Sequence, residues 1–356
     1  MTISETCRKA SFFLDYSYSQ DKRKEKMKPI FKLMLIIVVF VVAGCSSPTV
    51  TTDNYVAVTS LSPLTSITEA IAGDKIEVIG LIPEGENSHE FEPAPSLVTI
   101  LEKADVIILN GFNLETHVIE LAKTSKKETT EIVLLADIHI PESNYKFDFS
   151  FPKENGNPNP HTWTDPMLGL TFAEEITKRF STLDPDNSSY YQSNYESFKA
   201  RIMDLDQLIK ESVSSIPPNN RKLLTYHDSF PYFAERYGLE IIGAIQPSDF
   251  SEPTPREVID LIKQINNHNV PAIFGSEVFP SPILSQLAKE SNAEYIDELR
   301  DDDLPGEPGD PAHTYFGLLI YDLEILVSGL GGDASSIKDF DVSPTYEGQT
   351  KTTYPQ

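Results

Sequence analysis

Short apolar runs alternate with longer amphipathic segments in two separate blocks of the chain. In the first block, apolar runs predict strands at 55–60, 76–81, 106–109 and 132–135. Segments with helical spacing lie between them and predict helices at 63–72, 96–103 and 114–123. The run 106–109 is apolar at every position, which is typical of a strand buried on both faces. Strands that alternate with helices in this way predict a parallel sheet wrapped by helices.

A second block repeats the pattern near the C-terminus. Its apolar runs predict strands at 222–226, 241–245, 272–274 and 294–296. Its amphipathic segments predict helices at 230–237, 255–267, 282–290 and 314–330. This block therefore predicts a second parallel sheet of the same kind.

Between the two blocks lies a long segment with helical periodicity. After a loop rich in Pro, Asn and Gly at 141–160, Asp165-Pro166 opens a helix that runs to about residue 180. Residues 188–215 then carry apolar side chains at steps of three and four without an internal Gly or Pro. At 1.5 Å per residue this segment predicts a helix of roughly 40 Å.

These patterns together predict the fold class and the domains. The expected fold is α/β, with two lobes that each hold a parallel sheet wrapped by helices, joined by one long rigid linker helix. We expect an N-terminal α/β lobe at 55–187, a linker helix at 188–216, a C-terminal α/β lobe at 217–331 and a loosely packed polar tail at 332–356.

The first 44 residues have the pattern of a signal peptide. Basic residues precede an unbroken apolar run from Leu33 to Ala43, which is too short to span a membrane in the mature protein. VVAGC at 41–45 looks like the lipobox of a bacterial lipoprotein, so we expect Cys45 to carry lipid and 45–54 to be a polar tether. Translation could begin at Met1 or at Met27, the latter giving a signal peptide of more ordinary length.

The charge of the chain excludes two classes of partner, and its cysteine content bears on how the mature protein is stabilised. The chain has 29 Lys and Arg against 54 Asp and Glu, and removal of 1–44 leaves 21 against 50. Binding to nucleic acid or to an anionic membrane surface needs clustered basic side chains, so neither partner is expected. The other cysteine, Cys7, lies in the segment expected to be removed, so packing rather than disulfides must stabilise the mature protein.

Four histidines lie beside predicted strand ends or helix starts. His89 follows the strand 76–81, His161 precedes the helix opened by Asp165-Pro166, His227 directly follows the strand 222–226, and His313 lies in the first turn expected for the last helix. Two come from each half, so a cleft between the lobes could bring four imidazoles to one metal ion, with zinc favoured. We expect Asp310 to cap the last helix, with Pro311 at its first position. His117, His139 and His268 receive no role.

The segments around these histidines carry a resemblance to a known family. The segments are G-E-N-S-H-E-F-E-P-A-P-S around His89, N-P-H-T-W-T-D-P around His161, Y-H-D-S-F-P-Y-F-A-E-R-Y-G-L around His227, and G-D-P-A-H-T-Y-F-G-L-L-I-Y-D-L near the end. In order over Tyr55 to Leu330, they resemble the zinc/manganese-type substrate-binding lipoproteins of bacterial ABC importers. The resemblance implies a metal held between two α/β lobes that are bridged by one long helix.

The same resemblance implies a set of metal ligands. His89, His161 and His227 fall on the first three ligand positions of the family. At the fourth ligand position, His313 occupies the register of the family's aspartate, while Asp310 keeps the Gly-Asp pair. We therefore favour His313 as the ligand, with Asp310 as a helix cap or as a carboxylate that orients an imidazole. The reverse assignment, with Asp310 as the ligand, stays open. Four imidazoles would favour Zn²⁺ as bound substrate over Mn²⁺. The histidine-free loop Ser143–Asn159 weighs against zinc, because zinc-type members often carry a His-rich loop there.

The same residues bear on whether the site would catalyse or carry. The sequence has no H-E-x-x-H pair, and Glu277 after the strand 272–274 is the better candidate for an acid or base. We favour its interpretation as a rim carboxylate or a group that supports the metal ligands, with a role as an alternative ligand left open. A closed set of four protein ligands leaves no position for a reacting substrate, so we expect no enzyme. The resemblance implies a monomeric, lipid-anchored protein on the extracytoplasmic face of the cell membrane that delivers the ion to an ABC permease and its ATPase. The alternative is a surface adhesion or interaction lipoprotein with a structural metal, which should unfold on chelation where a carrier should not.

Overall fold

The computed structural model describes residues 55–246, 251–276, 281–291, 293–346 and 352–354. The predicted signal peptide, the tether, Cys45 and Glu277 lie outside these residues. All described residues belong to the compact unit Asn54–Gln356. Among them, no helix combines the length and the apolar character needed to cross a membrane.

The first lobe is built on a parallel four-stranded sheet with the strand order β2-β1-β3-β4. Its elements, in chain order, are β1 (Tyr55–Thr59), α2 (Ser62–Ala72), β2 (Ile76–Gly80), α3 (Val98–Leu101), β3 (Val106–Leu109), α4 (Thr116–Ser125), β4 (Glu131–Leu134) and α5 (Leu135–His139). Neighbouring residues of β1 and β3 bury their side chains in different apolar clusters: Ala57 and Ile108 in one, Val58 and Ile107 in the other. Helices therefore cover both faces of the sheet, as the continuous apolar run predicts.

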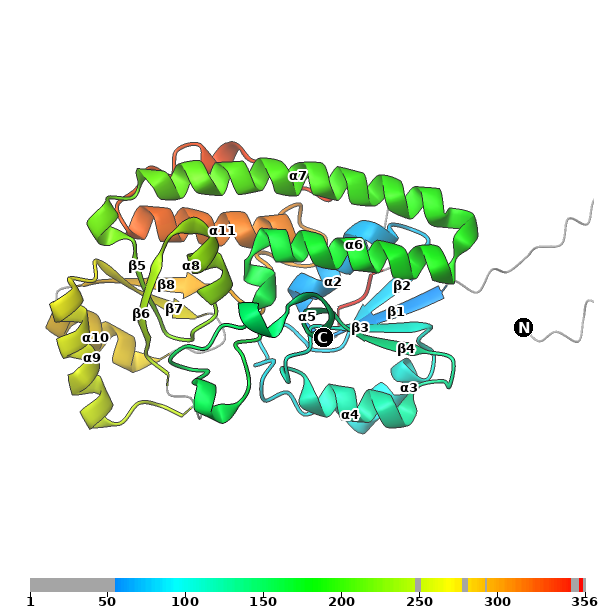
Figure 1. The fold of residues 1–356 in the computed structure, drawn as a ribbon, viewed down its shortest axis with the longest axis horizontal. Coiled ribbons are helices and arrows are strands. Elements are labelled where there is room, and N and C mark those ends of the chain that lie inside the picture. Colours follow the sequence, from blue (N-terminus) through cyan, green and yellow to red (C-terminus); the bar gives the residue numbers. More distant parts are fainter. Residues whose placement is uncertain (1–54, 247–250, 277–280, 292, 347–351, 355–356) are drawn as a thin grey trace, which may run out of the picture. The chain divides into compact units, whose positions relative to one another are not determined.

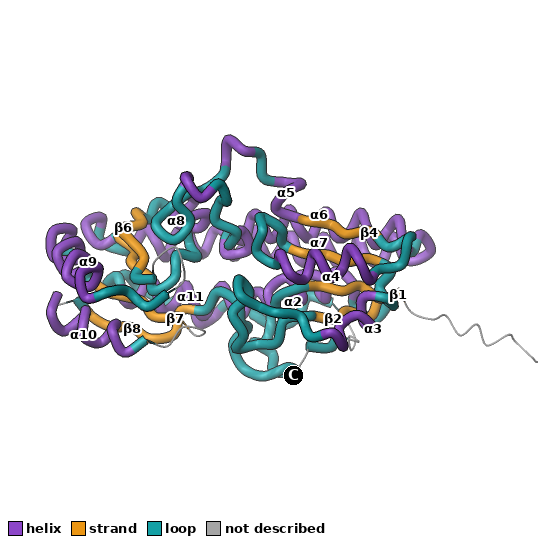
Figure 2. Tube along the Cα trace, turned by 90° about the horizontal axis from the view of Figure 1, so that it is seen from below, coloured by secondary structure: helices purple, strands orange, loops and turns teal. Residues whose placement is uncertain are grey.

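The second lobe repeats this topology with the strand order β6-β5-β7-β8. Its elements are β5 (Lys222–Thr225), α8 (Pro231–Tyr237), β6 (Glu240–Ala244), α9 (Pro255–His268), β7 (Ala272–Ser276), α10 (Pro282–Ser291), β8 (Glu294–Leu299) and α11 (Tyr315–Gly329). Seen from below, the strands of the two sheets form separate groups with loops between them (Figure 2). In open parallel sheets of this order, the loops at the carboxyl ends of the strands are the usual place for a ligand.

Three long helices join the lobes. α6 (Pro166–Leu183) and α7 (Ser188–Ser215) pack against each other, and α7 runs alongside elements of both lobes above α11 (Figure 1). One apolar cluster contains Ala57 of the first sheet, Phe198 of α7 and Phe274 of the second sheet. The two lobes therefore share a continuous core along these helices, which agrees with the predicted linker helix.

Most elements match the sequence prediction, and three features differ. The prediction missed α5, which starts directly at the end of β4. The tail is not loose where it is described, because Ile337 is buried and the Thr353 N–H donates to the Val78 carbonyl at 2.9 Å, beside β2. The expected Asp310 cap is wrong: Thr314 caps α11 by accepting a hydrogen bond from the Gly317 N–H at 3.0 Å.

A glycine in α6 permits the close approach of α11. A Cβ at Gly169 would lie 2.3 Å from Oη and 2.7 Å from Cζ of Tyr315, a buried side chain whose hydroxyl donates to the Trp163 carbonyl. In the interior of a solvent-exposed helix, Gly→Ala stabilises the folded protein by about 1 kcal/mol, because alanine has the higher helix propensity.

We expect Gly169→Ala to reverse that sign and destabilise the protein by about 1–3 kcal/mol, since the core must shift to admit the methyl group. Urea unfolding followed by circular dichroism measures this change, with Tyr315→Phe as the control for loss of the hydroxyl alone. A Gly169→Ala variant as stable as the wild type would contradict the packing described.

Candidate metal centre

Three of the four predicted histidines meet at the carboxyl ends of the strands. His89 lies in the loop after β2, His161 lies just before α6, and His227 follows β5 by two residues. Their Nε2 atoms form a triangle, with 3.1 Å between His89 and His161, 3.2 Å between His89 and His227, and 3.1 Å between His161 and His227. These three residues form a group of side chains able to hold one metal ion. His161 and His227 are buried, and His89 is partly exposed.

The side chain of Asn159 fixes the tautomer of His161. Asn159 donates its amide N–H groups to Asp148 Oδ2 at 2.8 Å and to the Asp228 carbonyl, so its oxygen Oδ1 faces His161. That oxygen lies 2.8 Å from His161 Nδ1. An amide oxygen can accept a hydrogen bond but cannot donate one, so Nδ1 carries the proton. The Nε2 atom of His161 therefore presents a lone pair to the other two histidines.

Gln246, two residues after the end of β6, does the same for His227. Its Oε1 atom lies 2.9 Å from His227 Nδ1, which therefore carries the proton. Two unprotonated Nε2 atoms thus face each other at 3.1 Å, and a single proton on His89 cannot bridge both of them well. Converging lone pairs of this kind are stabilised by a cation bound to all three nitrogens.

The loop of His89 is held by the opposite lobe. The Gly85 N–H donates to Asp303 Oδ2 at 2.8 Å, and the Ser88 N–H donates to Asp302 Oδ2 at 3.1 Å. Both aspartates are buried and lie in the loop after β8. The second lobe therefore positions a histidine that the first lobe supplies, so the three-histidine group depends on contact between the lobes.

Burial keeps the three imidazoles neutral near pH 7. Desolvation lowers the pKa of His227 to about 4, although the hydrogen bond that its imidazole donates to Gln246 acts in the opposite direction. Desolvation, followed by repulsion from His227, lowers the pKa of His89 and of His161 well below the usual range of histidine. Metal ions bind the neutral form of imidazole, so these pKa values leave the site ready for a cation at neutral pH.

The triangle has the right size for a transition metal ion. Zinc binds histidine nitrogens at about 2.0–2.1 Å, and an ion at that distance from all three Nε2 atoms would lie about 1 Å off the plane of the triangle. Such a position leaves room for a fourth ligand on the side of the ion away from the plane. The donor set and its spacing thus fit a four-coordinate ion.

Asp301 is a nearby carboxylate that the sequence reasoning missed. It lies two residues after β8, is buried, and holds Oδ2 3.7 Å from His161 Nε2. Its carbonyl accepts a hydrogen bond from Trp163 Nε1 at 2.7 Å, and the Trp163 ring packs on that of His161. The signal was available, since three consecutive aspartates follow a predicted strand at the ligand-binding edge of a sheet.

The structure does not bring His313 into the group of three. His313 is buried elsewhere, with Nε2 3.6 Å from Glu84 Oε1 and its ring centroid 5.0 Å from that of Tyr354. Asp310 is exposed and accepts a hydrogen bond from the Glu307 N–H at 3.0 Å. The expected convergence of four imidazoles is therefore wrong, because the turn between Asp310 and Thr314 directs His313 toward the tail instead.

The structure is that of a two-lobed solute-binding protein. It has two parallel sheets of equal topology, a shared helical core, and buried metal-ligand side chains between the lobes. The family described as zinc-uptake complex component A, periplasmic, matches residues 57–329, and the chain belongs to this family. The predicted family and fold class are thereby confirmed.

Individual relatives cover most of the chain. It is 27% identical over 309 residues to the metal ABC transporter substrate-binding lipoprotein SloC of Streptococcus mutans, covering 85% of this chain and 99% of SloC. It is 28% identical over 318 residues to the manganese ABC transporter substrate-binding lipoprotein PsaA of Streptococcus pneumoniae, covering 85% of this chain and 99% of PsaA. These relatives are named as solute-binding components of transporters, not as enzymes.

Solved structures agree with this assignment. The Mn-bound periplasmic metal binding protein of candidatus Liberibacter asiaticus matches with a TM-score of 0.69 and 27% identity, covering 78% of this chain and all of that one. The periplasmic zinc binding protein TroA of Treponema pallidum matches with a TM-score of 0.70 and 25% identity, covering 78% of this chain and 99% of TroA. The family thus binds transition metals as transported substrates, and the relatives are named for more than one metal.

The low pKa of His227 predicts how the metal-free protein responds to acid. An unfolded chain takes up a proton at His227 near pH 6.5, whereas the folded chain takes it up only near pH 4. Stability from the neutral imidazole is therefore complete above pH 6.5 and is lost as the pH falls from 6.5 toward 4.

We expect the free energy of unfolding of the wild type, relative to His227→Gln, to fall by up to about 3 kcal/mol over this range. Urea unfolding in the presence of a chelator measures it, and the variant serves as control because the buried Asp148 and Asp228 titrate in both proteins. A difference that stays constant with pH would contradict a buried neutral His227.

Proposed function

We propose that this protein is an extracytoplasmic substrate-binding lipoprotein that captures one divalent transition metal ion and delivers it to an ABC permease for import. The observation that carries the proposal is the triangle of three Nε2 atoms, two of which present lone pairs because amide oxygens hold their Nδ1 protons. A buried set of neutral imidazoles favours binding of a divalent cation, because metal ions bind the unprotonated nitrogen.

Zinc is the proposed substrate, with manganese second. Three imidazole nitrogens suit zinc better than manganese, which prefers carboxylate, carbonyl and water ligands. The names of the relatives weigh the other way, since several are named for manganese. Zinc stands first in the proposal because the ion must bind to the donor atoms of this chain, and three of these are imidazole nitrogens.

Asp301 is the proposed fourth ligand, in place of His313. Two ligands of a tetrahedral zinc ion lie roughly 3.3 Å apart, close to the 3.7 Å between Asp301 Oδ2 and His161 Nε2. A carboxylate opposite three neutral imidazoles would also halve the charge of the bound divalent ion. With four protein ligands the ion would keep no open position for a reacting substrate, which supports a carrier.

The anchor and the partners extend the proposal beyond the described residues. Cys45 would carry the lipid after removal of 1–44, and 45–54 would hold the two lobes, 55–187 and 217–331, off the membrane as a monomer. The family works with a membrane permease and its ATPase, so these are the proposed partners.

The metal preference is tested on metal-free protein. We expect the chelator-treated protein to remain folded and to bind one Zn²⁺ per chain, at least about a hundredfold more tightly than Mn²⁺, as the order of divalent affinities predicts. Titration calorimetry with a competing chelator gives both affinities, and circular dichroism reports the fold. Tighter binding of Mn²⁺ would overturn the choice of zinc, and unfolding on chelation would favour a structural metal over a carrier.

The fourth ligand is tested by a matched pair of variants. Asp301→Asn should weaken Zn²⁺ binding by at least about a hundredfold, because even the loss of partners outside the ligand shell costs ten- to a hundredfold. His313→Gln, equally buried in the same segment, should change the affinity by less than about threefold, since His313 contacts Glu84 and Tyr354 instead. The opposite ranking would restore His313 as the fourth ligand.

A further inference from the structure

One aromatic side chain covers the three-histidine group. The ring centroid of Phe151 lies 5.5 Å from that of His89, 5.6 Å from that of His161 and 5.9 Å from that of His227. Nearly equal distances to three rings place Phe151 close to the axis of the triangle rather than beside one histidine. Phe151 is only 9% exposed, although residues 153–157 of the same loop are exposed.

The loop that carries Phe151 is closed on itself. The Asn159 N–H donates to the Lys146 carbonyl at 2.8 Å, so the two ends of 146–159 meet, as in compact surface loops that often serve function. Near its start, the Phe149 N–H donates to Asp228 Oδ2 at 3.3 Å, and the Ser150 hydroxyl donates to the Gln246 carbonyl at 3.4 Å. This half of the loop is therefore tied to the second lobe, next to His227 and its partner.

The other half of the loop is tied to the first lobe by a side-chain hydrogen bond. Asn113 Nδ2 donates to Asn157 Oδ1 at 2.8 Å, and both side chains are exposed. Asn113 follows Gly111 and Phe112, and all three have positive φ, which is rare for side chains as large as Phe. Buried Glu115 accepts hydrogen bonds from the backbone N–H groups of Asn110 and Gly111 and so holds this turn in place.

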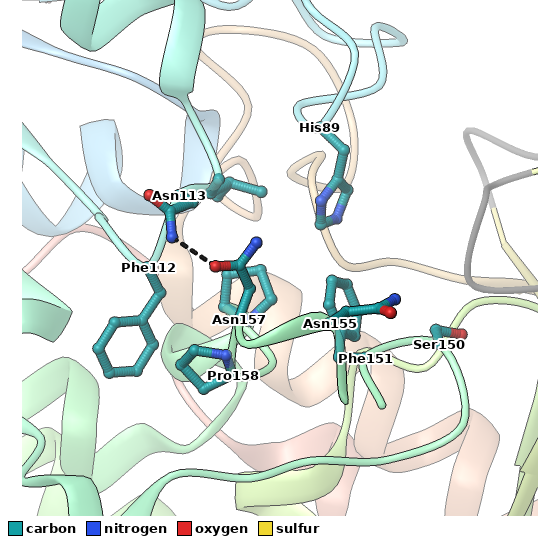
Figure 3. Close-up of a pocket in the computed structure, with 10 residues that line it drawn as sticks. His89, Phe112, Asn113, Ser150, Phe151, Asn155, Asn157 and Pro158 are labelled. Carbon is teal, nitrogen blue, oxygen red and sulfur yellow. Dashed lines mark hydrogen bonds between the residues drawn. The ribbon is translucent and has the colours of Figure 1, made fainter. Parts of the chain in front are cut away.

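A pocket of about 160 Å³ lies between the loop and this turn. Its lining includes His89 and Phe151 on the inner side and the exposed Asn113, Asn155 and Asn157 on the outer side (Figure 3). His89, the most exposed of the three histidines, points into the pocket in Figure 3. The pocket thus connects the solvent side of the loop with the edge of the metal centre.

We propose that Phe151 is the gate of the metal centre: its ring separates the bound ion from this pocket, and the Asn113–Asn157 hydrogen bond keeps the loop 146–159 closed. This inference rests on the proposed function, since it assigns a route and a barrier for the ion that the histidines bind. An apolar ring over the ion excludes water, and so slows both the entry of the ion and its removal by solvent. Phe151 touches the ligands and is a positioning residue, because it supplies no donor atom to the ion.

Removal of a gate should change the rates of metal exchange, whereas removal of a ligand should change the affinity. In Phe151→Ala both capture and release of Zn²⁺ should become at least about tenfold faster, while the affinity changes much less because the two rates rise together. Stopped-flow transfer of Zn²⁺ to a colorimetric chelator measures the rates. With Mn²⁺ bound, solvent proton relaxation should rise in the variant, as water gains access to the ion.

Matched variants in the same loop separate the gate from general loosening. Phe149→Ala removes an equal side chain that is 52% exposed two residues away, and its rates should equal those of the wild type. Phe151→Leu keeps an apolar cover and should restore slow exchange even if Phe151→Ala folds poorly. Asn157→Ala removes the Asn113–Asn157 hydrogen bond and should speed release of the ion by about threefold, which corresponds to the loss of one exposed hydrogen bond. Asn155→Ala keeps that hydrogen bond and should not change the rate.

Equal exchange rates in wild type, Phe151→Ala and Asn157→Ala would overturn the gate and leave the metal site intact. So would equal acceleration by Phe149→Ala and Phe151→Ala. A wild-type protein that binds neither Zn²⁺ nor Mn²⁺ would overturn the proposed function itself, and the gate with it, and this outcome is visible before any variant is made.

Discussion

The metal centre depends on two imidazole tautomers that amide side chains fix from behind. Asn159 and Gln246 each hold an Nδ1 proton, so that the Nε2 lone pairs of His161 and His227 converge with His89 within about 3 Å. In water such an arrangement would relax by rotation or protonation, but burial blocks both. The folded chain therefore holds converging nitrogen lone pairs in a buried site, and this arrangement is most stable when a cation is bound to them.

Contacts between the lobes supply the rest of the support. The amide of Asn159 is itself oriented by Asp148 and by the backbone of Asp228, and burial raises the pKa of Asp148 to about 6 and that of Asp228 well above its usual range. Asp302 and Asp303 of the second lobe hold the first lobe's histidine loop through its backbone N–H groups. Because the second lobe orients the loop of His89 and, through the Asp228 carbonyl and Asn159, also orients His161, the centre forms only where the lobes meet. The continuous core along α6, α7 and α11 keeps them in that register.

Periodicity along the chain predicted the fold well, because strand and helix patterns are local and α7 has no residue that could interrupt it. The grouping of His89, His161 and His227 was also predicted, since each lies at a strand end or helix start inside a distinctive motif. The placement of His313 beside them was wrong, because counting along a loop of Pro and Gly does not reveal which side chain turns inward. The contributions of Asp301, Asn159, Gln246 and Phe151 were not predicted either: they come from contacts between segments that lie far apart in the sequence.

The most direct test of this metal centre is a crystal structure of the metal-loaded protein, with anomalous diffraction recorded on both sides of the zinc and manganese edges. We predict one ion at about 2.0–2.2 Å from the Nε2 atoms of His89, His161 and His227 and from a carboxylate oxygen of Asp301. An ion bound elsewhere, or bound through the Nδ1 atoms that face Asn159 and Gln246, would contradict this arrangement.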